Sequence, residues 1–172
     1  AEYTLLHNKE PLIKIKLNVP GLHNAGNSLA AIAACCTMGA NVETAARALL
    51  KFRGTHRRFE KKGIRHGVTI IDDYAHHPTE VTAALKTALK VNNSRIWCIF
   101  QPHTYTRTKI LLEDFSQAFD YADIIIVTDI YAAREADSGE VNSQLLVEKI
   151  RQHGKNAIYI KDSESIVNNL AQ

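Results

Sequence analysis

The sequence predicts an α/β fold with a mostly parallel sheet flanked by helices. Segments typical of strands begin near residues 68, 95, 123 and 157, about one βα unit apart, and amphipathic segments lie between them. The segment Asp123–Thr128 is rich in Ile, a composition typical of a strand that is buried on both faces.

The first 53 residues show a different pattern. We predict that they are the end of a separate domain and contain one strand and two helices. Alternating apolar and Lys residues from Leu12 to Leu17 predict a half-exposed strand. The Ala-rich segment Asn24–Met38 predicts a buried helix that ends at Gly39, and Asn41–Phe52 predicts a second helix. Residues 53–57 are predicted to act as a hinge, because the composition changes there.

Residues 54–172 are predicted to form the domain that holds the parallel sheet. This domain opens with two strands at 57–61 and 68–71, joined by a turn around Gly63–Gly67. Helices and strands then alternate, and a last helix begins at Ser163. The other predicted strands are 95–100, 123–128 and 157–160, and the helices carry the apolar stripes Val81/Leu85/Leu89, Leu111/Phe115/Phe119 and Leu146/Ile150.

Composition excludes several classes of protein. No apolar run approaches membrane-spanning length, and no signal peptide opens the chain. Cys35, Cys36 and Cys98 have no framework spacing, so we expect buried, reduced thiols in a cytoplasmic protein. The common Gly-rich nucleotide fingerprints do not occur, and no His or Cys spacing is typical of zinc. We therefore expect no metal ligands within this sequence.

The charge is uneven, although the net charge is only +3. Residues 1–66 contain 11 Lys or Arg and 4 Asp or Glu, and Lys51–Arg65 contains seven basic residues and one acid. The pair Arg57 and Arg58 suits phosphate oxygens, because a guanidinium is a planar fork of donors. A phosphate of a small ligand is favoured over nucleic acid, since the segment lacks the interleaved aromatic residues that stack bases.

The run from Asp72 to Glu80 places two carboxylates, a phenol and two imidazoles between a strand and a helix. Ligands bind at the carboxyl ends of strands in open α/β sheets, so Asp73, Tyr74 and His76 are candidate site residues. The alternative is structural, with Asp72 or Asp73 capping the following helix and the imidazoles serving as surface groups.

Two further polar loops follow predicted strands. Phe100–Thr108 contains His103 and Arg107, and a guanidinium near a helix N-terminus favours an anion. The alternative is a loop with a Thr cap. Asp129–Glu135 is a weaker candidate after the next strand. If these strands belong to one parallel sheet, their loops converge at one rim, which a purely structural role does not explain.

A polar segment, His23–Asn27, opens the first predicted helix. Asn24 either caps this helix or pairs with the edge of an adenine, because an amide offers both a donor and an acceptor. The segment alone favours the cap.

Five segments in this order resemble the Mur ligases, and the resemblance covers nearly the whole chain. The segments read VPGLHNAGNSLAA, FRGTHRRFE, IDDYAHHPTEV, FQPHTYTRT and DIYAARE. Within the family, the sequence is most similar to the branch that ligates L-alanine to UDP-N-acetylmuramate in peptidoglycan precursor synthesis. The resemblance implies that residues 1–53 are the end of the central ATP-binding domain. It implies that residues 54–172 are the Rossmann-like, amino-acid-binding C-terminal domain, truncated at its end.

The resemblance also implies roles for individual residues. His23, Asn24 and Asn27 match the adenine motif, and Asp73 matches the residue near the ribose. Arg58, with Arg57 beside it, matches the arginine directed at the ATP phosphates. The amino-acid side is matched by Tyr74, His76, His103 and Arg107, and Arg58 and His76 are the expected catalytic residues. Thr104 stands where the family commonly has a basic residue.

The implied cofactor is ATP with Mg²⁺, and the implied substrates are L-alanine and UDP-N-acetylmuramate. The phosphate loop, the metal ligands and the UDP-binding domain would belong to upstream domains of the same polypeptide, so the fragment alone is expected to be inactive. Neither a nucleic acid nor a membrane is an expected partner. Two alternatives remain: a recycling ligase that adds a tripeptide to the same sugar, and a non-catalytic basic module that binds nucleotide or RNA.

Overall fold

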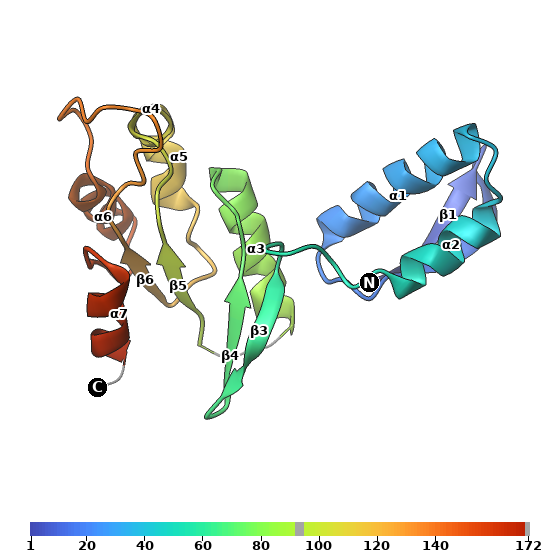
Figure 1. Cartoon of the computed structure of the whole chain (residues 1–172), viewed down its shortest axis with the longest axis horizontal. Helices are drawn as coiled ribbons and strands as arrows, with labels where there is room; N and C mark the ends of the chain where they lie inside the picture. The colour runs from blue at the N-terminus through green and yellow to red at the C-terminus, as the bar shows by residue number, and fades with distance from the viewer. Residues whose placement is uncertain (92–94, 171–172) are drawn as a thin grey trace. The chain divides into compact units, whose positions relative to one another are not determined.

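The computed structural model describes residues 1–91 and 95–170 (Figure 1). The chain divides into two compact units, Ala1–Tyr74 and Ala75–Gln172. None of the helices within the described residues has both the length and the apolar character needed to cross a membrane.

The first unit opens with an antiparallel hairpin of β1 (Glu2–His7) and β2 (Glu10–Lys16). Asn8 and Lys9 form its tight turn with φ values of 51° and 70°, which suits the right-handed twist of the two strands. The alternating residues of β2 behave as predicted, since Ile15 is buried and Lys16 is exposed. The strand β1 was not predicted, because the register shift between Leu5 and Leu6 interrupts its alternation.

Two helices complete this part of the first unit, α1 (Leu22–Thr37) and α2 (Val42–Lys51). The side chain of Asn41 caps α2 by accepting hydrogen bonds from the backbone N–H groups of Glu43 and Thr44. The prediction of a buried first helix was wrong, because most of the side chains of α1 are exposed or half-buried, Cys35 and Cys36 among them. The small core of this part contains Ile15, Leu17, Val19, Ile32 and Ala45.

The first unit also contains a second antiparallel hairpin, formed by β3 (Glu60–Arg65) and β4 (Val68–Asp72). His66 and Gly67 form its turn, with φ values of 49° and 81°. We predicted Gly63 within the turn, but it lies inside β3 at a register shift, where a glycine fits a bulge. We also predicted the strand near residue 68 in the parallel sheet. That was wrong, since the sheet containing β4 has two strands, β3 and β4.

The second unit confirms the predicted α/β fold. Its sheet has three parallel strands in the order β5, β6, β7, with a helix or helices in each connection, because parallel neighbours need a crossover (Figure 1). The strands are β5 (Trp97–Phe100), β6 (Ile124–Val127) and β7 (Ala157–Tyr159). The helices are α3 (Pro78–Val91), α4 (Tyr105–Ile110), α5 (Leu112–Gln117), α6 (Ser143–Gln152) and α7 (Ser163–Leu170).

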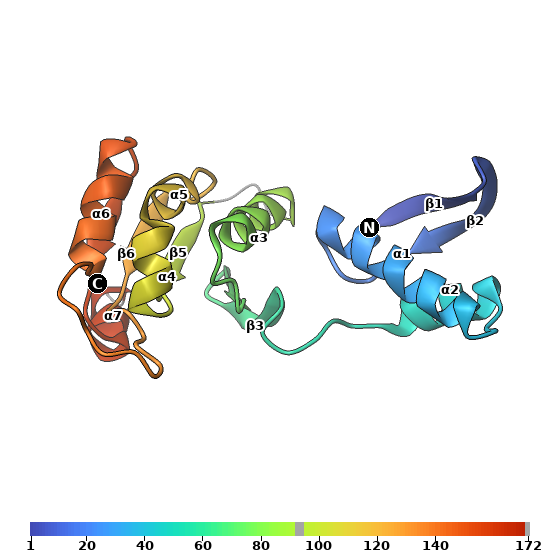
Figure 2. The same ribbon diagram turned by 90° about the horizontal axis from the view of Figure 1, so that it is seen from above.

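The core of the second unit lies between the sheet and three helices, α3, α5 and α6. The rings of Phe115 and Phe119 each lie 5.3 Å from the ring of Phe100 in β5. Ile125 points into this core, and the next residue, Ile126, is buried on the opposite face of the sheet. On that opposite face lies α7, across the sheet from α5 (Figure 2). The sheet is therefore firmly packed beneath the loops that leave its carboxyl edge.

Candidate functional site

Two loops at the carboxyl edge of the parallel sheet are joined backbone to backbone. The loop after β5 and the loop after β6 meet in a parallel bridge between His103 and Tyr131. The N–H of Tyr131 donates to the carbonyl of Pro102, and the N–H of Thr104 donates to the carbonyl of Tyr131, both at 2.8 Å. The pairing of β5 with β6 thus extends beyond the strands, and it holds the His103 and Tyr131 rings 5.4 Å apart.

His103 is also paired with Arg107 on α4. The Nη1 atom of Arg107 lies 3.2 Å from the Nδ1 atom of His103. A guanidinium can only donate, so Nδ1 of His103 must accept and its proton is carried on Nε2. The ring of His76 lies 6.0 Å from the ring of His103. The structure therefore brings together three of the predicted residues, His76, His103 and Arg107, which we call the rim cluster.

Thr104 sets the start of the helix that carries Arg107. Its backbone has φ 68° and ψ 144°, a conformation that residues other than glycine rarely adopt and that costs about 1–3 kcal/mol. Its hydroxyl accepts a bond from the N–H of Arg107 at 3.4 Å. Thr104 therefore caps α4, as the structural alternative for this loop predicted, and the same loop carries the candidate site residues His103 and Arg107.

Glu80 and His77 hold the start of α3 beside the rim cluster. The Glu80 carboxylate accepts a hydrogen bond from the N–H of His76 at 3.0 Å, and it lies 3.6 Å from the His76 ring nitrogen. This reach back from the first turn resembles a capping box, except that the bond goes to the residue before the N-cap position. The ring nitrogen Nδ1 of His77 lies 2.9 Å from the hydroxyl of Thr79. The position of His76 is therefore fixed by the helix that follows it.

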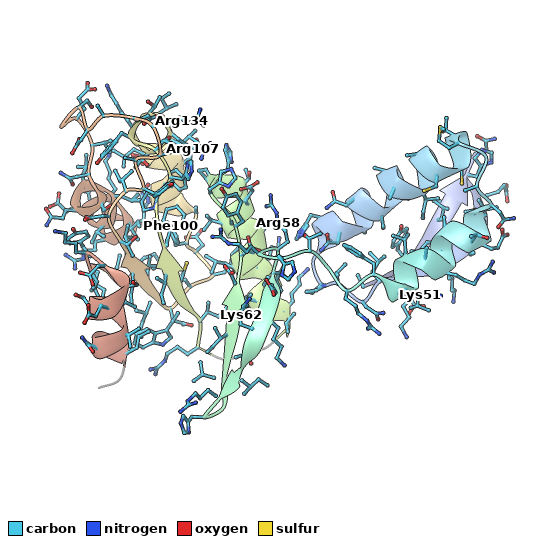
Figure 3. All side chains as sticks on the ribbon, in the orientation of Figure 1. Lys51, Arg58, Lys62, Phe100, Arg107 and Arg134 are labelled. Atoms are coloured by element: carbon cyan, nitrogen blue, oxygen red, sulfur yellow. The ribbon has the colours of Figure 1, made fainter. Side chains whose placement is uncertain are left out.

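A second group of predicted residues lies in the first unit, around the ring of Tyr74. The guanidinium carbons of Arg57 and Arg58 lie 4.7 Å and 5.8 Å from the centre of this ring, a distance suited to cation–π attraction. The N–H of Tyr74 donates to the carbonyl of Arg57 at 2.7 Å, and Asp72 lies 3.7 Å from the Arg57 Nε atom. Figure 3 labels Arg58 beside the β3–β4 hairpin.

Two carboxylates fix the backbone on either side of Arg58. Asp73 accepts a bond from the N–H of Phe59 at 2.8 Å, and Glu60 accepts one from the N–H of Arg57 at 2.9 Å. The bond from the Arg57 backbone lowers the pKa of the Glu60 carboxyl. Both Arg57 and Phe59 have positive φ values, 56° and 50°. The result is a tight turn that presents two exposed guanidinium groups, which suit an anion such as phosphate.

The third group lies at the start of α1, and its polar side chains contact neighbouring residues of the same segment. The helix begins after Gly21, whose φ is 97°, so Asn24 is not its cap. The Nδ2 atom of Asn24 donates to the carbonyl of Pro20 at 2.6 Å, and its Oδ1 atom accepts from Asn27 at 3.4 Å. A Cβ atom at Gly21 would lie 2.5 Å from the present position of the exposed His23 ring, and the φ of 97° itself favours glycine.

The predicted site residues therefore form three groups: the start of α1, the Tyr74 group and the rim cluster. Sequence reasoning did not single out Glu80, Tyr131 or Glu135 as individual site residues. A Glu three residues into a helix was a usable signal for Glu80. Among residues 1–91 and 95–170, no three His, Cys, Asp or Glu side chains are grouped so that they could hold a metal ion.

Comparison with known proteins identifies the family. A profile described as "Mur ligase, glutamate ligase domain" matches residues 57–172. The chain belongs to the Mur ligase family. Among its Mur ligase relatives, the UDP-N-acetylmuramate–L-alanine ligase of Acetivibrio thermocellus is 53% identical over 97% of this chain and 36% of the relative. The enzyme of the same name from Caldanaerobacter subterraneus is 49% identical over 100% of this chain and 37% of the relative.

Solved structures agree with this Mur ligase assignment. A UDP-N-acetylmuramate–alanine ligase from Thermotoga maritima matches with a TM-score of 0.78 and 31% identity, over 94% of this chain and 34% of that structure. A murein peptide ligase from Psychrobacter arcticus matches with a TM-score of 0.67 and 26% identity, over 92% of this chain and 33% of that structure. The chain thus spans a little over a third of the length of the relatives that it matches.

Proposed function

We propose that the full-length protein containing this chain ligates L-alanine to UDP-N-acetylmuramate at the expense of ATP. The observation that carries the proposal is the 53% identity, over 97% of the chain, to a relative that bears this name. In the proposed reaction, ATP phosphorylates the muramoyl carboxylate, the amine of L-alanine attacks the acyl phosphate, and phosphate leaves as the amide forms. The reaction belongs to the synthesis of peptidoglycan precursors, and a cytoplasmic location stays a prediction.

The rim cluster is proposed to bind the amino acid. L-alanine offers little apolar surface, so its carboxylate must supply much of its orientation, and the guanidinium of Arg107 suits it. The bond to His103 limits the directions that this guanidinium can take. His76, which Glu80 holds beside His103, is proposed to act at the amine. Tyr74 is proposed to complete the amino-acid side.

The Tyr74 group is proposed to serve the nucleotide as well. Arg58, with Arg57 beside it, would pair with phosphate oxygens and stabilise the charge that develops during phosphoryl transfer. The cation–π contact with Tyr74 supports this role, because it helps to orient both guanidinium groups. Asp73 is proposed to lie near the ribose, while its bond to Phe59 fixes the turn around Arg58.

The start of α1 is proposed to hold the adenine through Asn24, with His23 and Asn27 as neighbours. The amide of Asn24 already bonds to Pro20 and Asn27, which fixes its plane before a base arrives. Among the described residues, no group of three His, Cys, Asp or Glu side chains could hold the Mg²⁺ that accompanies ATP. Its ligands and the phosphate loop are proposed to belong to other domains of the polypeptide.

The corresponding domain assignment is also a proposal. Residues 1–53 would be the end of the central ATP-binding domain, and residues 54–172 would be the amino-acid-binding domain. Support comes from the family match, which begins at residue 57. The chain alone would then bind parts of the substrates without completing turnover.

The test is ATP-dependent phosphate release by the full-length protein with UDP-N-acetylmuramate and either L-alanine or a tripeptide. Release with L-alanine supports the proposal. Release with the tripeptide but not with L-alanine would contradict the proposal and favour a recycling ligase. The structural match to a murein peptide ligase is the observation that supports this second candidate. The isolated 172-residue chain serves as the control and is expected to release no phosphate.

A further inference from the structure

Glu135 touches the helix that carries Arg107, although it lies in a different loop. Its Oε2 atom accepts a hydrogen bond from the backbone N–H of Thr106, in the first turn of α4, at 2.8 Å. The bond from the Thr106 backbone lowers the pKa of the Glu135 carboxyl, so the group is a carboxylate near neutral pH. The first N–H groups of a helix have no partner within the helix, so an acceptor from outside fixes where the helix starts.

The short length of α4 makes this contact important. The helix has six residues, Tyr105–Ile110, so its own hydrogen bonds are too few to hold it. The residue before it, Thr104, has the unfavourable backbone conformation described above. External contacts must therefore keep the start of α4 in place. Two come from the loop after β6: the Tyr131 carbonyl, which accepts from the N–H of Thr104, and the Glu135 carboxylate.

Glu135 is itself held in a defined turn. Its N–H donates to the carbonyl of Ala132 at 3.0 Å, and the neighbouring Ala133 has a φ of 55°. The side chain is half-buried, and it borders a surface depression shared with Thr104, Thr106 and Arg107. The loop after β6 therefore delivers the carboxylate to α4 from a fixed position.

We propose that Glu135 is a positioning residue of the ligase: by fixing the first turn of α4, it sets the direction in which Arg107 meets the amino-acid carboxylate. This proposal rests on the proposed function for the identity of the substrate. The contact itself is a feature of the chain, whichever amine the protein uses.

Glu140 provides a matched control, because it is a second acid of the same loop that contacts the same helix. Its Oε1 atom lies 2.6 Å from the Nζ atom of Lys109, and both side chains are more than half exposed. This ion pair joins two solvent-exposed side chains, and such pairs contribute little to stability. Loss of Glu140 should therefore leave the start of α4 unchanged.

The experiment compares Glu135→Ala, Glu135→Gln and Glu140→Ala in the full-length protein. We expect Glu135→Ala to raise KM for L-alanine by about 10- to 100-fold, because small misplacements of a binding group have effects of this size. KM for UDP-N-acetylmuramate should change less than about twofold. Glu135→Gln keeps an acceptor oxygen, so it should lie between the wild type and Glu135→Ala. An unchanged KM for L-alanine in Glu135→Ala, or an equal rise in Glu140→Ala, would overturn the proposal.

A second measurement is independent of the substrate. Amide hydrogen exchange over residues 103–108 should be faster in Glu135→Ala than in the wild type, and unchanged in Glu140→Ala. Equal exchange in all three proteins would also overturn the proposal. If the wild type uses the tripeptide and not L-alanine, the proposed function fails, and the same KM comparison with the tripeptide still decides the role of Glu135.

Discussion

Arg107 is held on both its backbone and its side chain. Its N–H donates to the Thr104 hydroxyl, and its Nη1 atom donates to Nδ1 of His103. A guanidinium has five N–H donors, and the bond to His103 uses one of them. The arrangement therefore restrains the guanidinium, and other donors of the group suit the carboxylate that the proposed function assigns to Arg107.

The several N–H donors of the Arg107 guanidinium predict that lysine cannot replace this residue. In the full-length protein, Arg107→Lys should raise KM for L-alanine by about tenfold or more, since a hydrogen bond to a charged group is worth about 1.5–3 kcal/mol. Arg134→Lys is the control, because Arg134 is an exposed arginine on the loop after β6 (Figure 3). Steady-state kinetics with varied L-alanine measure both variants. A normal KM in Arg107→Lys would remove Arg107 from the amino-acid site.

The three cysteines predict two classes of thiol. Cys35 and Cys36 are exposed, contrary to the expectation of buried thiols, whereas Cys98 is half-buried and packs against the core of the second unit. Burial raises the pKa of the Cys98 thiol to about 12. Only the thiolate reacts, and at pH 8 a pKa of 12 leaves about one thiolate in ten thousand.

A chromogenic disulfide reagent at pH 8 should therefore label two thiols of the 172-residue chain rapidly. The third should react only after urea unfolds the protein, or as the pH is raised towards 12. Rapid labelling of all three thiols in the folded chain would show that Cys98 is accessible.

At the level of elements, the sequence predicted the helices and strands that a local pattern of residues identifies, but not the contacts between distant segments. The strand β6 has the sequence Ile-Ile-Ile-Val, which identifies a buried strand without any other information. Two strands joined by a turn were predicted where β3 and β4 lie, but the strand near residue 68 was also assigned to the parallel sheet, because spacing along the chain does not reveal which sheet a strand joins. The contact from Glu135 to Thr106 spans 29 residues, so no local pattern could reveal it.

The helix α6 allows a quantitative test at this level. Asn142 caps it by accepting from the N–H of Leu145 at 2.8 Å, and loss of such a cap costs about 1 kcal/mol. Asn142→Ala should lower the free energy of unfolding of the second unit by this amount. The control is Gln144→Ala, an exposed position inside the same helix, where alanine favours the helix.

Urea unfolding followed by tryptophan fluorescence measures this effect. Trp97, the one tryptophan of the sequence, lies in β5, so its fluorescence reports on the unit that contains α6. Equal midpoints for Asn142→Ala and Gln144→Ala would mean that the cap contributes nothing.

At the level of the whole molecule, the chain joins two compact units, and the family match begins inside the first of them. The β3–β4 hairpin lies within the residues that the family profile matches, although it belongs to the first compact unit, Ala1–Tyr74. The relatives are nearly three times as long as the chain, and the proposed function assigns catalysis to the full-length protein.

The predicted hinge at residues 53–57 can be tested at Gly54. Its φ is 98°, and a Cβ atom there would lie 3.4 Å from the Val19 side chain. Alanine in a left-handed conformation costs about 1–2 kcal/mol, so Gly54→Ala should push this segment towards a different backbone conformation. If the full-length enzyme must close around its substrates through this segment, kcat should fall severalfold.

Gly67→Ala separates a hinge effect from a loss of stability. Gly67 has a φ of 81° in the β3–β4 turn and open space around its Cα atom, so alanine there carries a similar backbone penalty away from the hinge. Both variants of the full-length protein should show a similar fall in Tm, while kcat falls in Gly54→Ala alone. Equal kcat values in the two variants would mean that residues 53–57 join the domains without taking part in turnover.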